Sequence, residues 1–134
     1  MQAKEIIEQL KKQGAKITSA RKLLVEIFTQ NHLPLTEMEL RRRLKVNKTT
    51  VYRQLELFLK LGIVKEVEFG DGKKRFEFNL HNHHHHLVCT NCQKVEDIFV
   101  HNDVKHVEDK IAKLKKFQVK SHSLEFFGLC AQCQ

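Results

Sequence analysis

Apolar residues recur at helical spacing through the first half of the chain. Ile6, Ile7 and Leu10 fall on one face of a predicted helix, which ends at Gly14. Thr18 is placed to cap a second helix. The side chains expected to point inward from that second helix are Leu23, Leu24, Ile27 and Phe28.

Two further helices are predicted before the pattern changes. Thr36 and Glu39 have the spacing of a capping box, in which a hydroxyl and a carboxylate bond the unpaired N–H groups of a helix start. The helix after this box ends near Leu44, and Asn47 is placed to cap the next one, which ends at Gly62. The core positions expected on this fourth helix are Val51, Leu55, Phe58 and Leu59.

Beyond residue 62 the period changes from helical to alternating. Residues 63–69 and 75–78 alternate like half-buried strands, and the Gly-containing segment between them predicts a tight turn. Helices followed by a hairpin form the winged-helix layout, a helix-turn-helix with a β wing. The remaining chain is expected to form strands near 87–89 and at 95–100 and 119–129, with a helix over 104–116.

These elements predict an α+β chain of two domains. A winged helix-turn-helix domain occupies residues 1–80, and a small α/β domain with an antiparallel sheet occupies residues 81–134, with a hinge at about 79–84. No apolar run approaches the roughly 20 residues that a bilayer requires. The N-terminus lacks a signal peptide. We therefore expect a cytoplasmic protein with no membrane partner.

Charged and metal-ligating residues are distributed unevenly between the two halves. Residues 1–80 hold 17 Lys and Arg against 10 Asp and Glu, whereas residues 81–134 hold 7 against 6. A basic half suggests a polyanionic partner, although a solvated Lys-rich surface has the same composition. All four Cys and eight of the nine His lie in residues 81–134.

The fourth helix has the residues of a DNA-reading element. A recognition helix reads base edges in the major groove with its N-terminal residues. Thr49 and Thr50 can bond phosphates, and Tyr52 can lie against a thymine methyl. Arg53 can donate two bonds to guanine, worth roughly 1–3 kcal/mol of discrimination. Segments 41–43 and 73–75 suit the phosphate backbone, but a partly buried Tyr52 and a solvated Arg run are the alternatives.

Two Cys-x-x-Cys pairs predict a structural zinc site. The pairs are Cys89 with Cys92 and Cys130 with Cys133. Tetrahedral Zn²⁺ accepts four thiolates, and each pair presents two sulfurs on one side. A thiol redox pair is the alternative, but such a pair should open a helix after a buried strand, and neither pair has that context.

A histidine run precedes the strand predicted near residue 87. Side chains alternate in an extended segment, so His84 and His86 face one way, and His83 and His85 the other. A mixed imidazole and carboxylate site suits Fe²⁺, Mn²⁺, Co²⁺, Ni²⁺ or Zn²⁺. A solvent-exposed His-rich hinge is the alternative. The carboxylates that can join these histidines are Glu77 and Asp97.

Four segments together resemble the ferric uptake regulator family of bacterial metal- and peroxide-sensing repressors. They are residues 14–18 with Arg21, 50–53, 84–92 and 122–130, so the resemblance covers nearly the whole chain. It implies a homodimer whose winged helices bind double-stranded DNA and whose C-terminal α/β domain is the dimerisation domain. It also implies that Tyr52 and Arg53 read bases and that Lys16 approaches the minor groove.

The same resemblance assigns metal ligands. Structural zinc is implied on the four cysteines. The regulatory metal is implied on Glu77, His84, His86 and Asp97, and a further site on His83, His85 and His122.

Two positions depart from the family pattern. Relatives usually supply a regulatory His just before the third helix, where this chain has Pro34, with His32 two residues earlier. Either His32 reaches the metal or the site lacks that ligand. The further site normally takes a carboxylate from the C-terminal helix, where this chain has Lys105. The substitutes considered for it are His101, Asp103 and His106.

These features predict a metal-responsive DNA-binding transcriptional regulator, a repressor of metal-homeostasis or oxidative-stress genes, and not an enzyme. The expected cofactors are structural Zn²⁺ and a second divalent metal, Fe²⁺, Mn²⁺ or Zn²⁺. Iron or manganese is favoured because no Cys remains for the regulatory site. The alternatives are a DNA-binding protein with structural zinc only and a zinc hydrolase, against which stands the lack of an HExxH motif.

Overall fold

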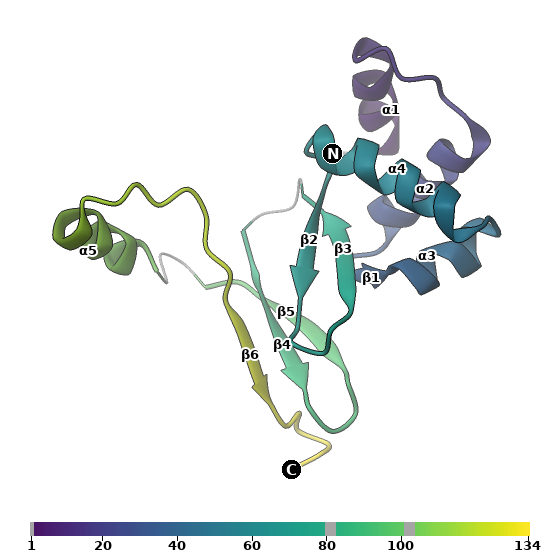
Figure 1. The fold of residues 1–134 in the computed structure, drawn as a ribbon. Coiled ribbons are helices and arrows are strands. Elements are labelled where there is room, and N and C mark those ends of the chain that lie inside the picture. Colours follow the sequence, from purple (N-terminus) through teal and green to yellow (C-terminus); the bar gives the residue numbers. More distant parts are fainter. Residues whose placement is uncertain (1, 80–82, 101–103) are drawn as a thin grey trace. The chain divides into compact units, whose positions relative to one another are not determined.

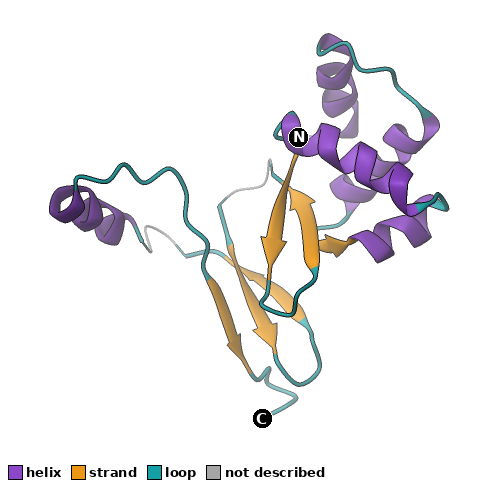
Figure 2. Cartoon of the chain, in the orientation of Figure 1, coloured by secondary structure: helices purple, strands orange, loops and turns teal. Residues whose placement is uncertain are grey.

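The computed structural model describes residues 2–79, 83–100 and 104–134 (Figure 1). The chain divides into two compact units, Met1–His81 and Asn82–Gln134. The first contains four helices and a small sheet, and the second contains a second small sheet and one helix, in the described residues (Figure 2). The α+β fold class predicted from the sequence is confirmed.

The second, third and fourth helices of the first unit begin at the predicted caps. The helices of this unit are α1 (Ala3–Lys12), α2 (Ser19–Gln30), α3 (Glu37–Leu44) and α4 (Lys48–Lys60). Thr18 Oγ1 accepts from the N–H of Arg21 at 3.2 Å, and Asn47 Oδ1 accepts from that of Thr50 at 2.8 Å. The capping box between Thr36 and Glu39 is present. Because these bonds span three residues, they could be read directly from the sequence.

These helices enclose one apolar core. Its largest fully buried side chains include Phe28, Phe58 and Phe76. Leu24, Ile27 and Phe28 are buried as predicted, but Leu23 is 38% exposed and Val25 is buried instead. Successive helical residues are about 100° apart, so Leu23 lies beyond the buried arc that runs from Ile27 through Phe28 to Val25.

A three-stranded antiparallel sheet completes the winged helix. Its strands are β1 (Leu35–Thr36), β2 (Val64–Glu68) and β3 (Lys74–Phe78), in the order β1-β3-β2. The turn between β2 and β3 has Gly70 at φ +77° and Gly72 at φ +76°, a region that side chains rarely adopt. Strand β1 was not predicted, since two residues are too few to show an alternating pattern.

The second unit is built on a mixed sheet. Its elements are β4 (His85–Cys89), β5 (Val95–Ile98), α5 (Lys105–Lys115) and β6 (Glu125–Gly128), with strand order β5-β4-β6. Strand β5 pairs with β4 antiparallel, but β6 pairs with it in parallel. The sheet is therefore not purely antiparallel as predicted. Parallel pairing puts the ends of β4 and β6, each followed by cysteines, at the same edge.

The last strand is shorter than expected, because only Glu125–Gly128 of the predicted segment 119–129 is paired. The second unit also buries few apolar side chains. Among its described residues the buried hydrophobic positions are Val88 and Cys89, and helix α5 buries none. Leu114 is 73% exposed and Phe127 is 53% exposed. This unit thus presents apolar surface that its own core does not cover.

Candidate metal centres and nucleic-acid interface

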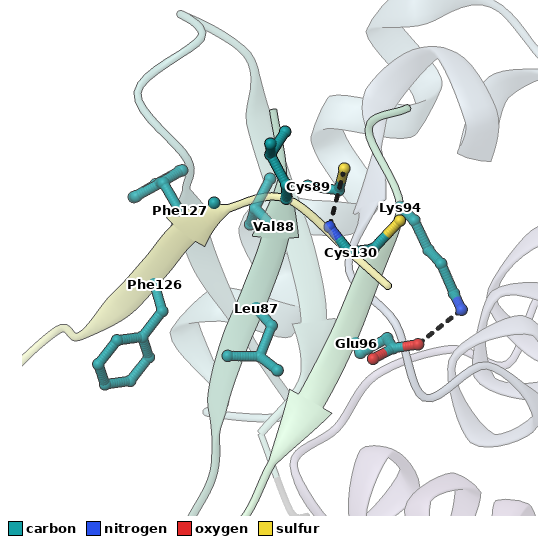
Figure 3. A pocket seen from close by; sticks show the side chains of 10 residues that line it. Leu87, Val88, Cys89, Lys94, Glu96, Phe126, Phe127 and Cys130 are labelled. Carbon is teal, nitrogen blue, oxygen red and sulfur yellow. Dashed lines mark hydrogen bonds and ion pairs between the residues drawn. The ribbon is translucent and has the colours of Figure 1, made fainter. Parts of the chain in front are cut away.

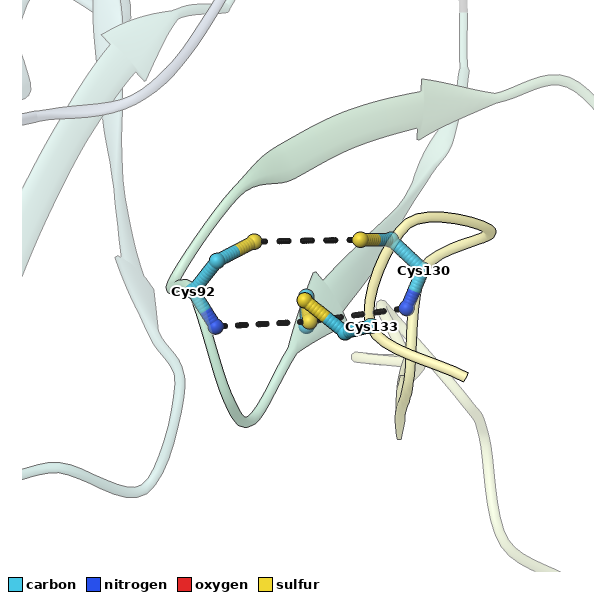
Figure 4. A group of neighbouring side chains, drawn as sticks. Cys92, Cys130 and Cys133 are labelled. Carbon is cyan, nitrogen blue, oxygen red and sulfur yellow. Dashed lines mark hydrogen bonds between the residues drawn. The ribbon is translucent and has the colours of Figure 1, made fainter.

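The four cysteines lie together at one edge of the second sheet (Figure 4). Cys89 ends β4 and Cys130 follows β6, and each is followed by a turn that returns its Cys-x-x-Cys partner. The four Sγ atoms lie within 4.8 Å of one another, and those of Cys92 and Cys130 are 3.8 Å apart. None of the four is in a disulfide. Zn–S bonds of about 2.3 Å in a tetrahedron place sulfurs at about this separation.

Backbone amides favour the thiolate form of Cys89. The N–H groups of Cys130 and Cys92 point at Cys89 Sγ, at 3.4 and 3.5 Å, and lower the pKa of the Cys89 thiol from 9.0 to about 6. Metal ligands must be deprotonated, and a closed set of four sulfurs suits structural zinc. The donor set therefore fits the zinc predicted from the sequence.

A second group of possible ligands is formed by His84, His86 and Asp97. Residues His86 and Asp97 are direct partners across the β4–β5 pair. Asp97 Oδ1 lies 3.9 Å from His84 Nε2 and 3.7 Å from His86 Nε2, and the two imidazole centroids are 5.0 Å apart. These distances are too long for hydrogen bonds. They are close to the separations of ligands that share one ion through bonds of about 2.1 Å.

Asp97 provides the test of whether these residues fit a cation. Its Oδ1 is buried and accepts no hydrogen bond from the described residues. A buried carboxylate oxygen without a hydrogen bond is costly unless a cation is bound to it. Two imidazoles and this oxygen therefore fit a divalent metal.

The two other residues predicted for the regulatory site belong to the first unit. Glu77 lies on β3, is buried, and has Oε1 at 3.1 Å from Nζ of Lys65, its partner across the β2–β3 pair. His32 is exposed on the loop after α2, and Pro34 is buried. The participation of Glu77 and His32 in the regulatory site stays a prediction.

The remaining histidines form a third group within the second unit. His83, His85 and His122 have ring nitrogens within 4.8 Å of one another. The run 83–86 therefore sends alternate side chains into two different clusters, as the extended pattern predicted.

A carboxylate missed in the sequence also reaches this third group. Glu108 Oε1 lies 2.7 Å from His122 Nδ1. Glu108 follows Lys105 by three residues, so both occupy neighbouring turns of one face of α5. The three-residue spacing between Lys105 and Glu108 was the sequence signal that could have identified Glu108. Among the substitutes considered, His106 is exposed on α5, whereas His101 and Asp103 lie outside the described residues.

Helix α4 exposes the residues predicted to read DNA. Tyr52 is 37% exposed, Arg53 and Thr49 are exposed, and Thr50 is half-buried. The Lys48 ammonium lies 5.9 Å from the centre of the Tyr52 ring. Lys16 is exposed on the loop between α1 and α2. Tyr52 is thus partly exposed, which leaves both interpretations open, a base-reading side chain and a partly buried aromatic.

Arg21 connects this loop to the recognition helix. Its Nε donates to Gln54 Oε1 at 2.8 Å, and its Nη1 donates to the backbone oxygen of Lys16 at 2.6 Å. The sequence had placed Arg21 only within a resembling segment, because the partner Gln54 is 33 residues away.

On the wing, the predicted phosphate-binding segment 73–75 is partly engaged within the protein. The Arg75 guanidinium donates to both carboxylate oxygens of Asp71, at 2.9 and 2.8 Å, and lies 4.8 Å from the centre of the Phe69 ring. The bond from Arg75 holds the pKa of the Asp71 carboxyl well below its usual range. Lys73 and Lys74 remain exposed.

A small apolar hollow of about 190 Å³ lies over the second sheet beside the cysteines (Figure 3). Leu87 and Phe126 form part of its wall, and the ion pair between Lys94 and Glu96, at 2.6 Å, lies at its side. Phe126 is 46% exposed. Phe127, the next residue of β6, also lines the hollow.

Comparison with known proteins gives matches along almost the whole chain. Residues 2–127 match the ferric uptake regulator family. The peroxide-responsive repressor PerR of Staphylococcus aureus is 33% identical, over 97% of this chain and 90% of that protein. The ferric uptake regulator of Vibrio cholerae is 32% identical with a TM-score of 0.75, covering 92% of this chain and 98% of that one. That of Helicobacter pylori has a TM-score of 0.80 at 23% identity, covering 99% and 94%, and shows the same fold.

The first unit is a winged helix, and the second unit contains clusters of metal-ligating side chains. Together they define the class of metal-responsive, DNA-binding transcription regulators. The chain belongs to the ferric uptake regulator family. Regulators of this family bind DNA and act as dimers, and they are not enzymes. No helix in the described ranges is long and apolar enough to cross a membrane.

Proposed function

We propose that this protein is a metal-dependent repressor of metal-homeostasis or oxidative-stress genes, with iron or manganese favoured over zinc as the regulatory metal. The observation that carries the proposal is the buried Oδ1 of Asp97, which lies within 4 Å of Nε2 of both His84 and His86. Imidazole and carboxylate donors suit Fe²⁺ and Mn²⁺. Thiolates would favour zinc, but the four cysteines form a cluster of their own.

Structural zinc on Cys89, Cys92, Cys130 and Cys133 is the second part of the proposal. Zinc there would hold the segment after β6 against the end of β4. Replacing Cys133 by Ser should lower the zinc content of the purified protein and the melting temperature of the second unit. A variant that keeps a full equivalent of tightly bound zinc would contradict this assignment.

Dimerisation through the second unit is the third part. Helix α5, the loop after it and strand β6 expose apolar side chains, with Leu114 at 73%, Phe117 at 60% and Phe127 at 53%. Large exposed apolar side chains on a small unit are typical of a protein interface. Because regulators of this family act as dimers, we assign the surface to a second copy of the chain. The proposed place of action is the cytoplasm, where the operator is.

The regulatory ligands couple metal to DNA through the wing. A bound divalent cation would compensate the negative charge of the buried Asp97 carboxylate. We propose, from the family resemblance, that Glu77 on wing strand β3 joins His84, His86 and Asp97 as a ligand, with His32 as the candidate for a fifth. A ligand set drawn from both units restricts the hinge and fixes the spacing of the two recognition helices. Allosteric coupling of about 1–3 kcal/mol corresponds to a 5- to 150-fold change in affinity.

For the DNA contacts we propose roles by position. Tyr52 and Arg53 on the exposed face of α4 read bases in the major groove, and Thr49 and Thr50 at its N-terminus bond phosphates. Lys16 approaches the minor groove. Double-stranded operator DNA is therefore the proposed partner of the first unit.

The test is DNA binding by the zinc-loaded protein at fixed salt, using the promoter of its own gene. Anaerobic Fe²⁺, then Mn²⁺, Zn²⁺ and Ni²⁺, would be titrated against the native chain and a His84→Ala/His86→Ala variant. We expect one metal to tighten binding at least 5-fold in the native chain and not in the variant. High affinity that is equal with every metal would instead identify a DNA-binding protein with structural zinc only.

A peroxide-responsive form of this function is the second candidate. It is favoured by the 33% identity to a protein named a peroxide-responsive repressor. The expectation is that H₂O₂ oxidises a ligand histidine of the Fe²⁺-loaded protein, adding one oxygen atom with water as the other product. The oxidised protein would then release DNA. Mass spectrometry of the His84- and His86-containing peptide would detect it, with the Mn²⁺-loaded protein as the unreactive control.

A further inference from the structure

Lys48 occupies the first position of the recognition helix α4, where a cation is unfavourable. Asn47 caps this helix, and its first turn contains no acidic residue. A helix N-terminus carries partial positive charge, so the helix dipole repels a lysine at this position. The Lys48 side chain is exposed, and no carboxylate of the described residues pairs with it. Lys48 therefore opposes the stability of the helix that it begins.

Other cations suited to the DNA backbone are already held by carboxylates of the protein. Arg41 Nε lies 3.7 Å from Glu37 Oε1 on α3, and Arg75 is bonded to Asp71 on the wing. A phosphate would have to compete with these carboxylates for the two guanidinium groups. It would meet no such competition at Lys48.

The neighbour of the Lys48 ammonium is the ring of Tyr52. The two residues are four positions apart, so they are adjacent on the helix surface. Lys48 Nζ lies over the ring, 5.9 Å from its centre, within the range of a cation–π contact. The ammonium covers one face of a ring that is 37% exposed. This contact restricts the ring and leaves its other face for a base.

The same end of α4 also has backbone donors that the protein does not use. Asn47 Oδ1 accepts from the N–H of Thr50 at 2.8 Å, but no described residue accepts from the N–H groups of Lys48 and Thr49. Unpaired N–H groups at a helix start favour an anion. A phosphate there would also offset the repulsion between the helix dipole and Lys48.

We propose that Lys48 is a specificity-determining residue of the recognition helix. Its ammonium donates to a DNA phosphate, and its contact with Tyr52 holds that ring against the methyl group of a thymine. The inference rests on the proposed reading of bases by Tyr52. It adds a residue that both anchors the first turn of α4 and orients the side chain that reads the base.

The test measures binding of the full-length, zinc-loaded chain, with saturating Mn²⁺, to the promoter of its own gene. A salt series gives the slope of log affinity against log salt. A second operator, with uracil in place of thymine, lacks the methyl groups but keeps the base pairs. The native chain should bind the uracil operator at least about 4-fold more weakly, the value of one buried methyl group.

Lys48→Met keeps the length of the side chain and removes the charge. It should reduce the salt slope by about 1 for each protomer bound and lower the uracil penalty to less than about 2-fold. Its melting temperature should equal or exceed that of the native chain, because a repelled cation is gone. Lys48→Arg should keep both properties, since a guanidinium also binds phosphate and lies against aromatic rings. Lys60→Met, an exposed change in the last turn of the same helix, is the matched control and should behave as the native chain.

Three results in Lys48→Met would overturn the proposal. A native salt slope would exclude the phosphate contact, and a native uracil penalty would exclude the role in specificity. A lowered melting temperature together with both losses would make Lys48 a structural residue.

Tyr52→Leu tests the proposed function separately. This variant should lose the uracil penalty and keep the native salt slope. If it retains the penalty, Tyr52 does not read the methyl group, and the proposed base reading and this inference both fail. If Tyr52→Leu loses the penalty and Lys48→Met does not, the base reading stands and only this inference fails.

Discussion

Arg21 donates from Nε to Oε1 of Gln54 at 2.8 Å, and thereby joins the start of α2 to the recognition helix α4. Its second bond, to the backbone oxygen of Lys16, holds the loop that carries Lys16. One guanidinium thus fixes both the loop proposed for the minor groove and the helix proposed for the major groove.

Replacing Arg21 by Ala should weaken operator binding about 10- to 150-fold, since a bond from a charged donor is worth roughly 1.5–3 kcal/mol. Arg21→Lys should also bind weakly, because an ammonium cannot make both bonds in the same geometry. Fluorescence anisotropy at several salt concentrations would measure the affinity and its salt dependence.

The salt dependence separates positioning from direct phosphate contact. We expect Arg21→Ala to keep the native slope of log affinity against log salt, whereas Arg42→Ala, an exposed residue proposed to contact phosphate, should reduce the slope by about 1. A reduced slope in Arg21→Ala would mean that Arg21 itself contacts the backbone of DNA.

The ion pair between Asp71 and Arg75 restrains a cation that we propose contacts the DNA backbone. Asp71→Asn should release Arg75, strengthen DNA binding and steepen the salt dependence by about 1. The carboxyl pKa of Asp71 is lowered by its bond to Arg75, so the pair is fully formed above the ordinary Asp pKa of 3.8 and is lost only as pH falls well below it. The effect of the variant on DNA binding should therefore be constant between pH 6 and pH 8. Weaker DNA binding by Asp71→Asn would contradict this prediction. It would show that the Asp71–Arg75 bonds, by ordering the wing, contribute more to DNA affinity than the charge of a free Arg75.

Lys65 is expected to compete with the regulatory metal. Its Nζ lies 3.1 Å from Glu77 Oε1 and is 40% exposed, so the pair is partly screened by solvent. Removing the ammonium in Lys65→Met should raise metal affinity modestly, about 1.5- to 5-fold, as for a solvated ion pair. Lys65→Arg is the control and should leave the affinity near the native value. If Lys65→Met binds metal no better in a competition titration, Glu77 is not a regulatory ligand.

The exposed apolar side chains of the second unit should control the oligomeric state. Leu114 is 73% exposed on α5, and Leu114→Glu would place a charge in the proposed dimer interface. We expect sedimentation equilibrium to show a shift from dimer to monomer while zinc content stays at the native level. Lys110→Glu, an exposed change on the same helix, is the control and should remain dimeric. A dimeric Leu114→Glu variant would move the interface away from α5.

Local signals in the sequence were sufficient for much of the fold and for the family. Thr18, Thr36 and Asn47 cap their helices as predicted, because each cap acts within three residues. Alternation along an extended segment separated His83 and His85 from His84 and His86 for a similar reason. The predicted family and the predicted class of regulator are confirmed by comparison.

Contacts between distant segments were decided only by the tertiary structure. Sequence spacing showed two Cys-x-x-Cys pairs. Only the parallel pairing of β6 with β4 brings the Sγ atom of Cys92 to 3.8 Å from that of Cys130. The bonds from Arg21 to Gln54 and between Glu108 and His122 join residues 33 and 14 positions apart. Periodicity reports which face a residue occupies within one element. Which elements then lie side by side depends on packing and pairing of the whole unit, and so it could not be read from the chain alone.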